Sequence, residues 1–133
     1  MPRIEKSEAE WRAQLSDDEY RVLREQGTEP AWSGELLESK GDGMYQCRGC
    51  GADLFKSGTK FDSGSGWPSF YESVNRDAVT LVEDREYGMI RTEVRCAACD
   101  SHLGHVFGDG HGTPTGERYC INSVCLTFQE DDE

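Results

Sequence analysis

Four of the six cysteines form two C-x-x-C pairs, Cys47 with Cys50 and Cys96 with Cys99. Thiolates at this spacing are typical ligands of a tetrahedral zinc ion. One ion held by both pairs would join two distant turns of the chain and contribute on the order of 10 kcal/mol to folding. A shell of four thiolates leaves no open position on the metal, so we expect one structural zinc per chain.

Disulfides and a thioredoxin-like redox motif are the other interpretations of these pairs. No apolar leader segment follows Met1, so we expect a cytoplasmic protein, and disulfides are rare in the reducing cytoplasm. A redox C-x-x-C motif belongs between a strand and a helix, and neither pair has that setting. Metal binding is therefore the favoured interpretation.

The remaining cysteines, Cys120 and Cys125, lie in a strand-like run at 119–128. Arg118 and Asn122 flank Cys120 two residues away on either side, and in a strand these three side chains share a face. A nearby guanidinium lowers the pKa of a thiol and so favours the thiolate, which is the nucleophilic form. Cys120 is therefore the candidate nucleophile. Cys125 should face the other way as a small buried apolar residue.

Two histidines and a tryptophan complete the set of residue types that could do chemistry. His102 and His105 follow the second cysteine pair. Acid–base chemistry is favoured for them over metal ligation or a place in the core, because four thiolates already fill a zinc shell. The Gly-Trp-Pro-Ser-Phe segment at 66–70 suggests a rigid Trp67 wall beside a pocket, although the spacing alone favours a purely structural tryptophan.

Two short helices are predicted ahead of these motifs. Ser7 and Ser16 each precede a glutamate by three residues, which is the capping-box pattern at a helix N-terminus. The apolar spacing behind them predicts helices at about 8–15 and 17–26, and we expect them to cover a core. Gly27 is suited to end the second helix.

Glycine-rich turns then divide the chain into short strand-like runs. The clearest runs are at 44–46, 79–82, 89–94 and 119–128. Many short strands between such turns favour an antiparallel sandwich or barrel over a parallel sheet. We expect a helical segment at about 7–27, a zinc-bound β core at about 33–128 and an acidic tail at 129–133.

Length and charge exclude several classes of protein. With 133 residues, the chain has room for one domain, 1–133. Its 26 acidic and 14 basic residues give a formal net charge of −12, which argues against nucleic-acid binding and against self-association, so we expect a monomer. No apolar run approaches the roughly 20 residues that span a bilayer, so we expect no membrane partner.

Taken together and in this order, the motifs resemble those of the methionine-R-sulfoxide reductase B family. The resemblance covers about residues 11–128 and depends on the two cysteine pairs together with four further segments. These segments lie at 27–30, 66–70, 102–107 and 118–123. Any one of them alone would be weak evidence, but the ordered set is highly specific.

The resemblance implies a fold, an activity and a set of site residues. The fold would be mainly β, with two antiparallel sheets forming a tent or open barrel, short N-terminal helices and a structural zinc. The activity would be reduction of the R epimer of methionine sulfoxide in peptides and proteins, with thioredoxin or another thiol as reductant. The implied catalytic residues are Cys120, His105, His102, Arg118 and Asn122, and the implied substrate-binding residues are Trp67, Phe107 and Asp109.

The implied chemistry accounts for these residue types. A sulfoxide sulfur becomes electrophilic when its oxygen is protonated, so a general acid must lie near the attacking thiolate. His105 or His102 would deliver that proton, and Arg118 would keep the nucleophile anionic. Methionine then leaves and Cys120 becomes a sulfenic acid. A methyl group held against Trp67 would set the preference for one epimer.

The sequence departs from the commonest family pattern at Ser65, where many members carry a resolving cysteine. No cysteine precedes Cys47, Cys125 should face away, and the metal-binding thiolates are already committed. We therefore expect no efficient intramolecular disulfide to Cys120. Either an external thiol reduces the sulfenic acid directly, or Ser65 is an engineered replacement that traps the enzyme.

Two other functional classes compete with the reductase. One is a non-catalytic zinc-bound β module that binds partners, since fold does not fix function; the other is an enzyme with a catalytic zinc on the histidines. The reductase predicts that Cys120→Ser abolishes sulfoxide reduction and leaves the fold intact. A binding module predicts no effect of that change, and a catalytic zinc predicts loss of metal on replacing His102.

Overall fold

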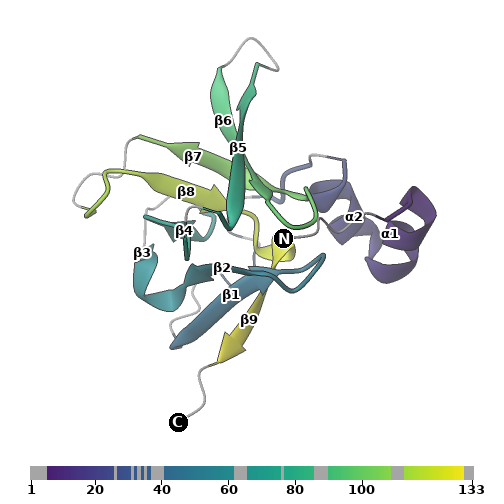
Figure 1. Cartoon of the computed structure of the whole chain (residues 1–133), viewed down its shortest axis with the longest axis horizontal. Helices are drawn as coiled ribbons and strands as arrows, with labels where there is room; N and C mark the ends of the chain where they lie inside the picture. The colour runs from purple at the N-terminus through teal and green to yellow at the C-terminus, as the bar shows by residue number, and fades with distance from the viewer. Residues whose placement is uncertain are drawn as a thin grey trace.

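The computed structural model describes residues 6–25, 27–30, 32, 34, 36, 41–61, 66–75, 77–85, 90–108 and 113–130. Its elements are two short helices and a series of short strands arranged in two antiparallel sheets. In Figure 1 the smaller sheet lies below the larger one, and the helices lie to one side of both. The predicted mainly β fold is confirmed, and the two sheets do not join into a closed barrel.

The helices begin where the sequence predicts. α1 (Glu8–Gln14) and α2 (Asp17–Leu23) each have the full capping box: the serine side chain accepts from the glutamate amide three residues later, and the glutamate side chain accepts from the serine amide. Both helices end one to three residues before their predicted limits. Trp11 is buried on the inner face of α1, and α2 buries its own apolar residues in the same way.

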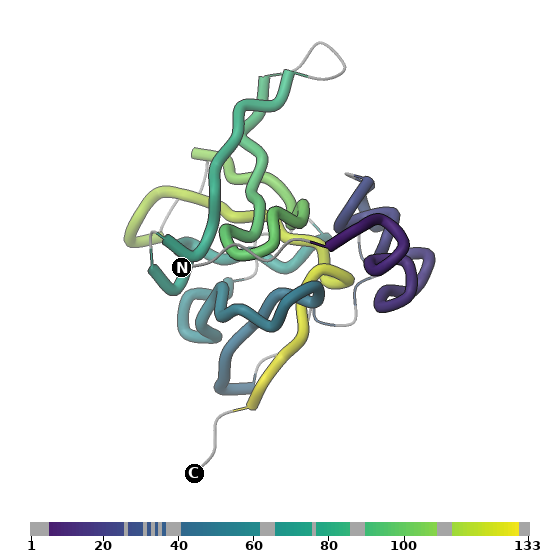
Figure 2. Tube along the Cα trace, turned by 45° about the vertical axis from the view of Figure 1, so that its right-hand side comes forward, coloured from purple at the N-terminus to yellow at the C-terminus, as the bar shows by residue number. Residues whose placement is uncertain are grey.

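The smaller sheet has the order β2–β1–β9, with β1 (Gly43–Cys47) between β2 (Asp53–Lys56) and β9 (Leu126–Glu130). The larger sheet has six strands in the order β3–β4–β8–β7–β6–β5. Its strands are β3 (Lys60–Phe61), β4 (Ser69–Phe70), β5 (Val79–Asp84), β6 (Arg91–Cys96), β7 (His102–Phe107) and β8 (Arg118–Ile121). Figures 1 and 2 both show β5 and β6 extending as a pair beyond the other strands.

The run at 119–128 is not the continuous strand predicted from the sequence. β8 ends at Ile121, a 3-10 turn follows at Ser123–Cys125, and β9 then joins the other sheet. Distant groups cause this break, because the Asn122 side chain donates to the Leu103 carbonyl at 3.0 Å and the Val124 amide donates to the Glu29 carboxylate at 2.9 Å. Cys125 therefore lies in a turn between the sheets, where it is fully buried as expected.

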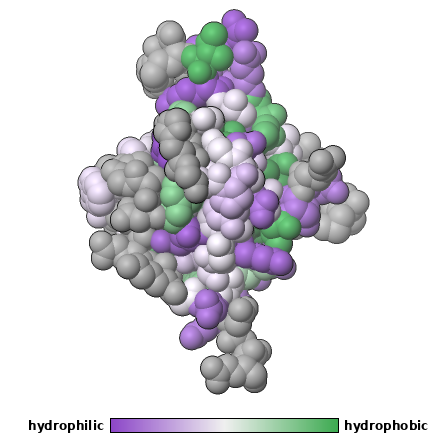
Figure 3. All heavy atoms as spheres, turned by 90° about the vertical axis from the view of Figure 1, so that its left-hand side faces the viewer, coloured by the Kyte–Doolittle hydropathy of each residue, from purple (hydrophilic) through white to green (hydrophobic). Residues whose placement is uncertain are grey.

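Aromatic side chains fill the space between the sheets. The Phe55 and Phe70 rings stack with centroids 4.5 Å apart, and Tyr45 meets Phe70 edge-on at 5.1 Å. All three are fully buried, so this cluster supplies much of the apolar burial that joins the two layers. On the face drawn in Figure 3, exposed apolar side chains form small separate groups among polar ones. Within the described residues, no helix is long and apolar enough to cross a membrane.

Candidate functional site

The four cysteines of the C-x-x-C pairs converge. Their sulfurs all lie within 4.8 Å of one another, with 3.7 Å between Cys47 and Cys99 and 3.6 Å between Cys50 and Cys96. A tetrahedron with Zn–S bonds of about 2.3 Å requires sulfurs about 3.8 Å apart. These four residues are therefore positioned to bind a metal ion, and their spacing and softness fit zinc.

The two cysteine turns have the same backbone geometry although they lie on different sheets. Each begins at the last residue of a strand and closes with a bond from the fifth residue to the first carbonyl, Gly51 to Cys47 and Asp100 to Cys96, both at 2.8 Å. The closing residues have positive φ, 79° for Gly51 and 64° for Asp100. Because the left-handed conformation recurs at both turns, the chain is shaped locally to turn two sulfurs toward one point.

Strand register places the candidate nucleophile beside a histidine. Cys120 on β8 is the cross-strand partner of Ser69 on β4 and of His105 on β7. Directly paired residues point to the same face of a sheet with their Cβ atoms about 5 Å apart. Cys120 is half-buried, so its thiol lies near an imidazole while remaining accessible from one side.

A bulge brings the second histidine to the same region. His102 and His105 are three residues apart, and in a regular strand they would face opposite sides. The register between β6 and β7 shifts between Val94 and Arg95, where Val94 pairs with Gly104 but Arg95 pairs with His102. This extra residue rotates His102 to the side of His105, and their ring centroids lie 5.5 Å apart.

A cavity of about 220 Å³ lies over this part of the sheet. Ligand pockets for larger molecules occupy about 300–1,000 Å³, so this cavity suits a single side chain. The described residues that line it are Thr28, Trp67, Arg91, Gly104, His105, Phe107, Arg118, Cys120 and Asn122. A larger cavity of about 810 Å³ lies between α2 and β9, but no cysteine or histidine is among its described lining residues.

Six of the eight predicted catalytic and substrate-binding residues therefore line one cavity. The guanidinium of Arg118 lies 4.6 Å from the centre of the Phe107 ring, as expected for cross-strand partners. His102 is not among the lining residues and lies behind His105, 4% exposed. Asp109 and the resolving position Ser65 lie outside the described residues.

Glu29 connects two walls of the cavity, a role that the sequence did not reveal. Its carbonyl accepts the Trp67 indole N–H at 2.9 Å, and its amide donates to the Asn122 side chain at 3.0 Å. Its carboxylate, 3% exposed, accepts the Val124 amide at 2.9 Å. One buried residue therefore holds the tryptophan, the asparagine and the turn after β8 in fixed relative positions.

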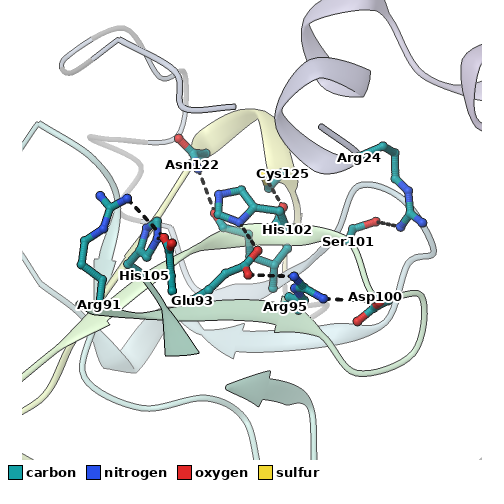
Figure 4. A network of polar contacts seen from close by, with 12 residues as sticks. Arg24, Arg91, Glu93, Arg95, Asp100, Ser101, His102, His105, Asn122 and Cys125 are labelled. Carbon is teal, nitrogen blue, oxygen red and sulfur yellow. Dashed lines mark hydrogen bonds and ion pairs between the residues drawn. The ribbon is translucent and has the colours of Figure 1, made fainter. Parts of the chain in front are cut away.

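Each histidine is paired with a carboxylate from another strand of the same sheet, and Figure 4 shows the pair of His102 and Glu93. His102 Nδ1 lies 2.7 Å from Glu93, which also accepts from Arg95 at 3.0 Å. His105 Nε2 lies 2.9 Å from Asp84. Burial lowers the pKa of His105, and the Asp84 carboxylate opposes that shift.

Sequence reasoning missed the carboxylates because their pairing depends on strand register. One signal was available, since charged residues at 91, 93 and 95 alternate along β6 and so share a face. Three ion pairs lie on this face of the sheet. They join Arg91 to Asp84, Glu93 to His102, and Glu93 to Arg95. Asp84 alone carries no local signal of this kind.

A family model described as the SelR domain matches residues 15–130, a span that holds the four-cysteine cluster and the described lining of the cysteine–histidine cavity. A relative in Leifsonia xyli is 62% identical over 131 residues, covering 98% of this chain and 94% of that protein. Others in Synechococcus and Methanosarcina barkeri are 56% and 55% identical, covering 96% and 98% of this chain and 93% and 91% of their own lengths. All three are named peptide methionine sulfoxide reductase MsrB. The chain belongs to the SelR-domain family of MsrB peptide methionine sulfoxide reductases, as its motifs predicted.

Proposed function

We propose that this protein reduces the R epimer of methionine sulfoxide in peptides and proteins and so repairs oxidised proteins. The observation that carries the proposal is the pairing of Cys120 with His105 on a cavity walled by Trp67. A nucleophile, a proton donor and an apolar wall are the three parts that sulfoxide reduction needs.

Substrate binding follows from the distribution of polarity in the cavity. The sulfoxide methyl group packs against Trp67, and the oxygen lies toward His105 and Asn122. The S epimer would exchange these two groups and place an oxygen against an indole and a methyl against polar donors. Burying a polar group without a hydrogen bond costs about 1–3 kcal/mol, so the cavity would discriminate between the two epimers.

The first half-reaction transfers one oxygen atom. The Cys120 thiolate attacks the sulfoxide sulfur while His105 protonates the oxygen. This attack forms a transient S–S bond; as the oxygen passes to the cysteine sulfur, the substrate S–O bond and this S–S bond both break, and Cys120 is left as a sulfenic acid. Methionine leaves with two more electrons than the sulfoxide had, and these electrons come from the cysteine sulfur.

The two histidines have different parts in this step. His105 lines the cavity and is half-buried, so it can reach the sulfoxide oxygen. His102 is 4% exposed and is paired with Glu93 at 2.7 Å, so it supports the site from behind. We assign proton delivery to His105 and orientation of the neighbouring groups to His102.

Regeneration requires an external thiol. One thiol condenses with the sulfenic acid to give a mixed disulfide and water, and a second thiol releases Cys120 and leaves as a disulfide. Cys125 is a poor internal alternative, because burial raises the pKa of its thiol well above its ordinary value. Thioredoxin or a small cytoplasmic thiol would supply the electrons.

The role of Ser65 has its own test. Ser65→Cys should raise thioredoxin-driven turnover and leave the first half-reaction unchanged, because a resolving thiol acts only after the sulfenic acid has formed. Equal thioredoxin-driven rates for both forms would contradict the proposal that this chain lacks an efficient intramolecular disulfide to Cys120.

The metal has a structural part in this proposal. Cys47, Cys50, Cys96 and Cys99 would hold one zinc ion, which joins the end of β1 to the end of β6. Its contribution is to folding, and no step of the reaction passes through it.

The test of the function uses separated epimers of a dabsylated methionine sulfoxide, followed by chromatography. The protein should reduce the R epimer alone, and Cys120→Ser should abolish the activity while circular dichroism and metal content stay unchanged. Reduction by the Cys120→Ser variant, or reduction of the S epimer, would contradict the assignment.

A further inference from the structure

Asp84, on the edge strand β5, contacts the imidazole of the proton donor. One of its carboxylate oxygens lies 2.9 Å from His105 Nε2 and 3.2 Å from an Arg91 guanidinium nitrogen. The side chains of His105 and Asp84 are 13% and 15% exposed, and that of Arg91 is 28% exposed. These three groups therefore form a partly buried chain that ends at the cavity.

The sheet register brings this chain together from three adjacent strands. Asp84 and Arg91 are the last register pair of β5 and β6. Arg91 is two residues from Glu93, which is the partner of His105 on β7, so all these side chains share a face. Arg91 and His105 both line the cavity, whereas Asp84 is not among its described lining residues.

We propose that Asp84 is a positioning residue that holds His105 in the Nε2–H tautomer and so directs Nδ1 to the sulfoxide oxygen. This inference depends on the proposed function. An imidazole that donates to a carboxylate through one nitrogen takes up and releases its catalytic proton through the other. The contact with Asp84 uses Nε2 of His105, so Nδ1 is the nitrogen that we assign to the substrate.

The proton balance is simple in this arrangement. The imidazolium carries protons on both nitrogens, and the proton on Nδ1 passes to the sulfoxide oxygen as the thiolate attacks sulfur. Asp84 remains ionised throughout and retains the Nε2–H bond. Arg91 contacts the same carboxylate oxygen and holds the carboxylate in place, so the ring keeps one orientation during the transfer.

Several charged groups act on His105, and together they determine whether removing the Asp84 charge raises or lowers its pKa. The groups facing it are Asp84 from β5, Arg91 and Glu93 from β6, His102 from β7, and Arg118 and Cys120 from β8. Burial, Arg91 and His102 lower the pKa of His105, whereas Asp84 raises it. Removing the Asp84 charge should therefore lower this pKa further.

The kinetic test is the first half-reaction of Asp84→Asn across the pH range, measured as methionine formed in a single turnover. His105 delivers a proton only while protonated, so the rate falls as pH rises through its pKa. In Asp84→Asn this alkaline limb should move to lower pH, with a loss of ~10-fold or more at pH ~8 and a smaller loss at acidic pH. A profile that superimposes on the wild type, or a loss equal at every pH, would overturn the inference.

A matched control comes from the same strand. Glu83 precedes Asp84, faces the other side, and pairs with Arg85 at 3.1 Å with more than half of its side chain exposed. Glu83→Gln removes the same charge from β5 and should leave the pH profile unchanged. A shift as large as that of Asp84→Asn would mean that overall charge, and not the contact with His105, sets the effect.

The second measurement is made on the wild-type protein, so it depends neither on enzymatic activity nor on the folding of a variant. Nitrogen-15 chemical shifts of the His105 ring in the wild-type protein report which nitrogen carries the proton. The Nε2–H tautomer should predominate at neutral pH, and a predominant Nδ1–H tautomer would overturn the inference. Because this readout is independent of turnover, an inactive wild-type protein would contradict the proposed function and leave the tautomer test intact.

Discussion

The four-cysteine cluster and the cavity hold sulfur in opposite surroundings. In the cluster each sulfur lies within 4.8 Å of three others, and three of the four cysteines are buried. At the cavity, Cys120 is half-buried between Ser69 and His105, and no second cysteine is among the described lining residues. The same residue type is a candidate metal ligand in one place and a candidate nucleophile in the other, because its neighbours differ.

The two regions are also built by different means. Each cysteine turn is shaped locally, over five residues that close with a left-handed residue, Gly51 or Asp100. The cavity instead depends on the pairing of β4, β8, β7 and β6, whose members are far apart in the chain. Damage to the first region should therefore affect folding, and damage to the second should affect chemistry.

The largest expected effect is the removal of one cluster cysteine. Cys99→Ser leaves three thiolates for the metal, and the lost binding energy, on the order of 10 kcal/mol, rivals the whole stability of a small domain. We expect loss of bound metal and of the cooperative unfolding transition, measured by metal analysis and denaturant unfolding. A Cys99→Ser protein that is folded, metal-free and fully active would contradict the claim that the four-cysteine cluster is needed for folding.

A smaller effect should follow from crowding the nucleophile's strand. A Cβ atom at Gly104 would overlap the Cys120 carbonyl oxygen, so Gly104→Ala must push β7 and β8 apart. Overpacking of this kind costs about 1–3 kcal/mol, and the half-reaction should slow because the Cys120–His105 pairing is disturbed. Thermal unfolding and single-turnover rates measure the two effects.

Gly108 provides the control for this substitution. It follows β7 directly, and a Cβ atom there would meet nothing within 4 Å. Gly108→Ala should therefore change neither stability nor rate by a comparable amount. Equal behaviour of the two alanine variants would show that the close approach at Gly104 has no role.

The smallest expected effect concerns Cys125, which belongs to neither region. Its thiol is fully buried and donates to the His102 carbonyl at 3.2 Å. Cys125→Ala should cost about 1 kcal/mol of stability through the lost contact and leave turnover with an external thiol unchanged. A loss of recycling in Cys125→Ala would identify it as a resolving cysteine and contradict the proposal of external reduction.

The features that the sequence predicted correctly are the local ones. The capping boxes at Ser7 and Ser16 are satisfied within four residues, and the paired cysteine turns follow from their own spacing. The break after Ile121 could not be predicted, because it depends on acceptors at Leu103 and Glu29 that are distant in the chain.

The candidate site shows the same division. The motifs predicted which residues would gather, and six of them line one cavity. The bulge that turns His102 toward His105 and the contact with Asp84 are consequences of strand register. A periodicity of two in the sequence predicts which residues share a face of a strand. It does not predict which residue of the neighbouring strand lies opposite each of them.

The most direct test of the central claim is to locate the oxygen atom after one turnover. The protein, fully reduced and freed of excess thiol, is mixed with one equivalent of an R-sulfoxide peptide and treated with dimedone, which labels sulfenic acids. Peptide mass spectrometry should find the label on Cys120 alone, with an equal amount of methionine formed. Methionine formed without a label on Cys120, or a label on a cluster cysteine, would contradict the account.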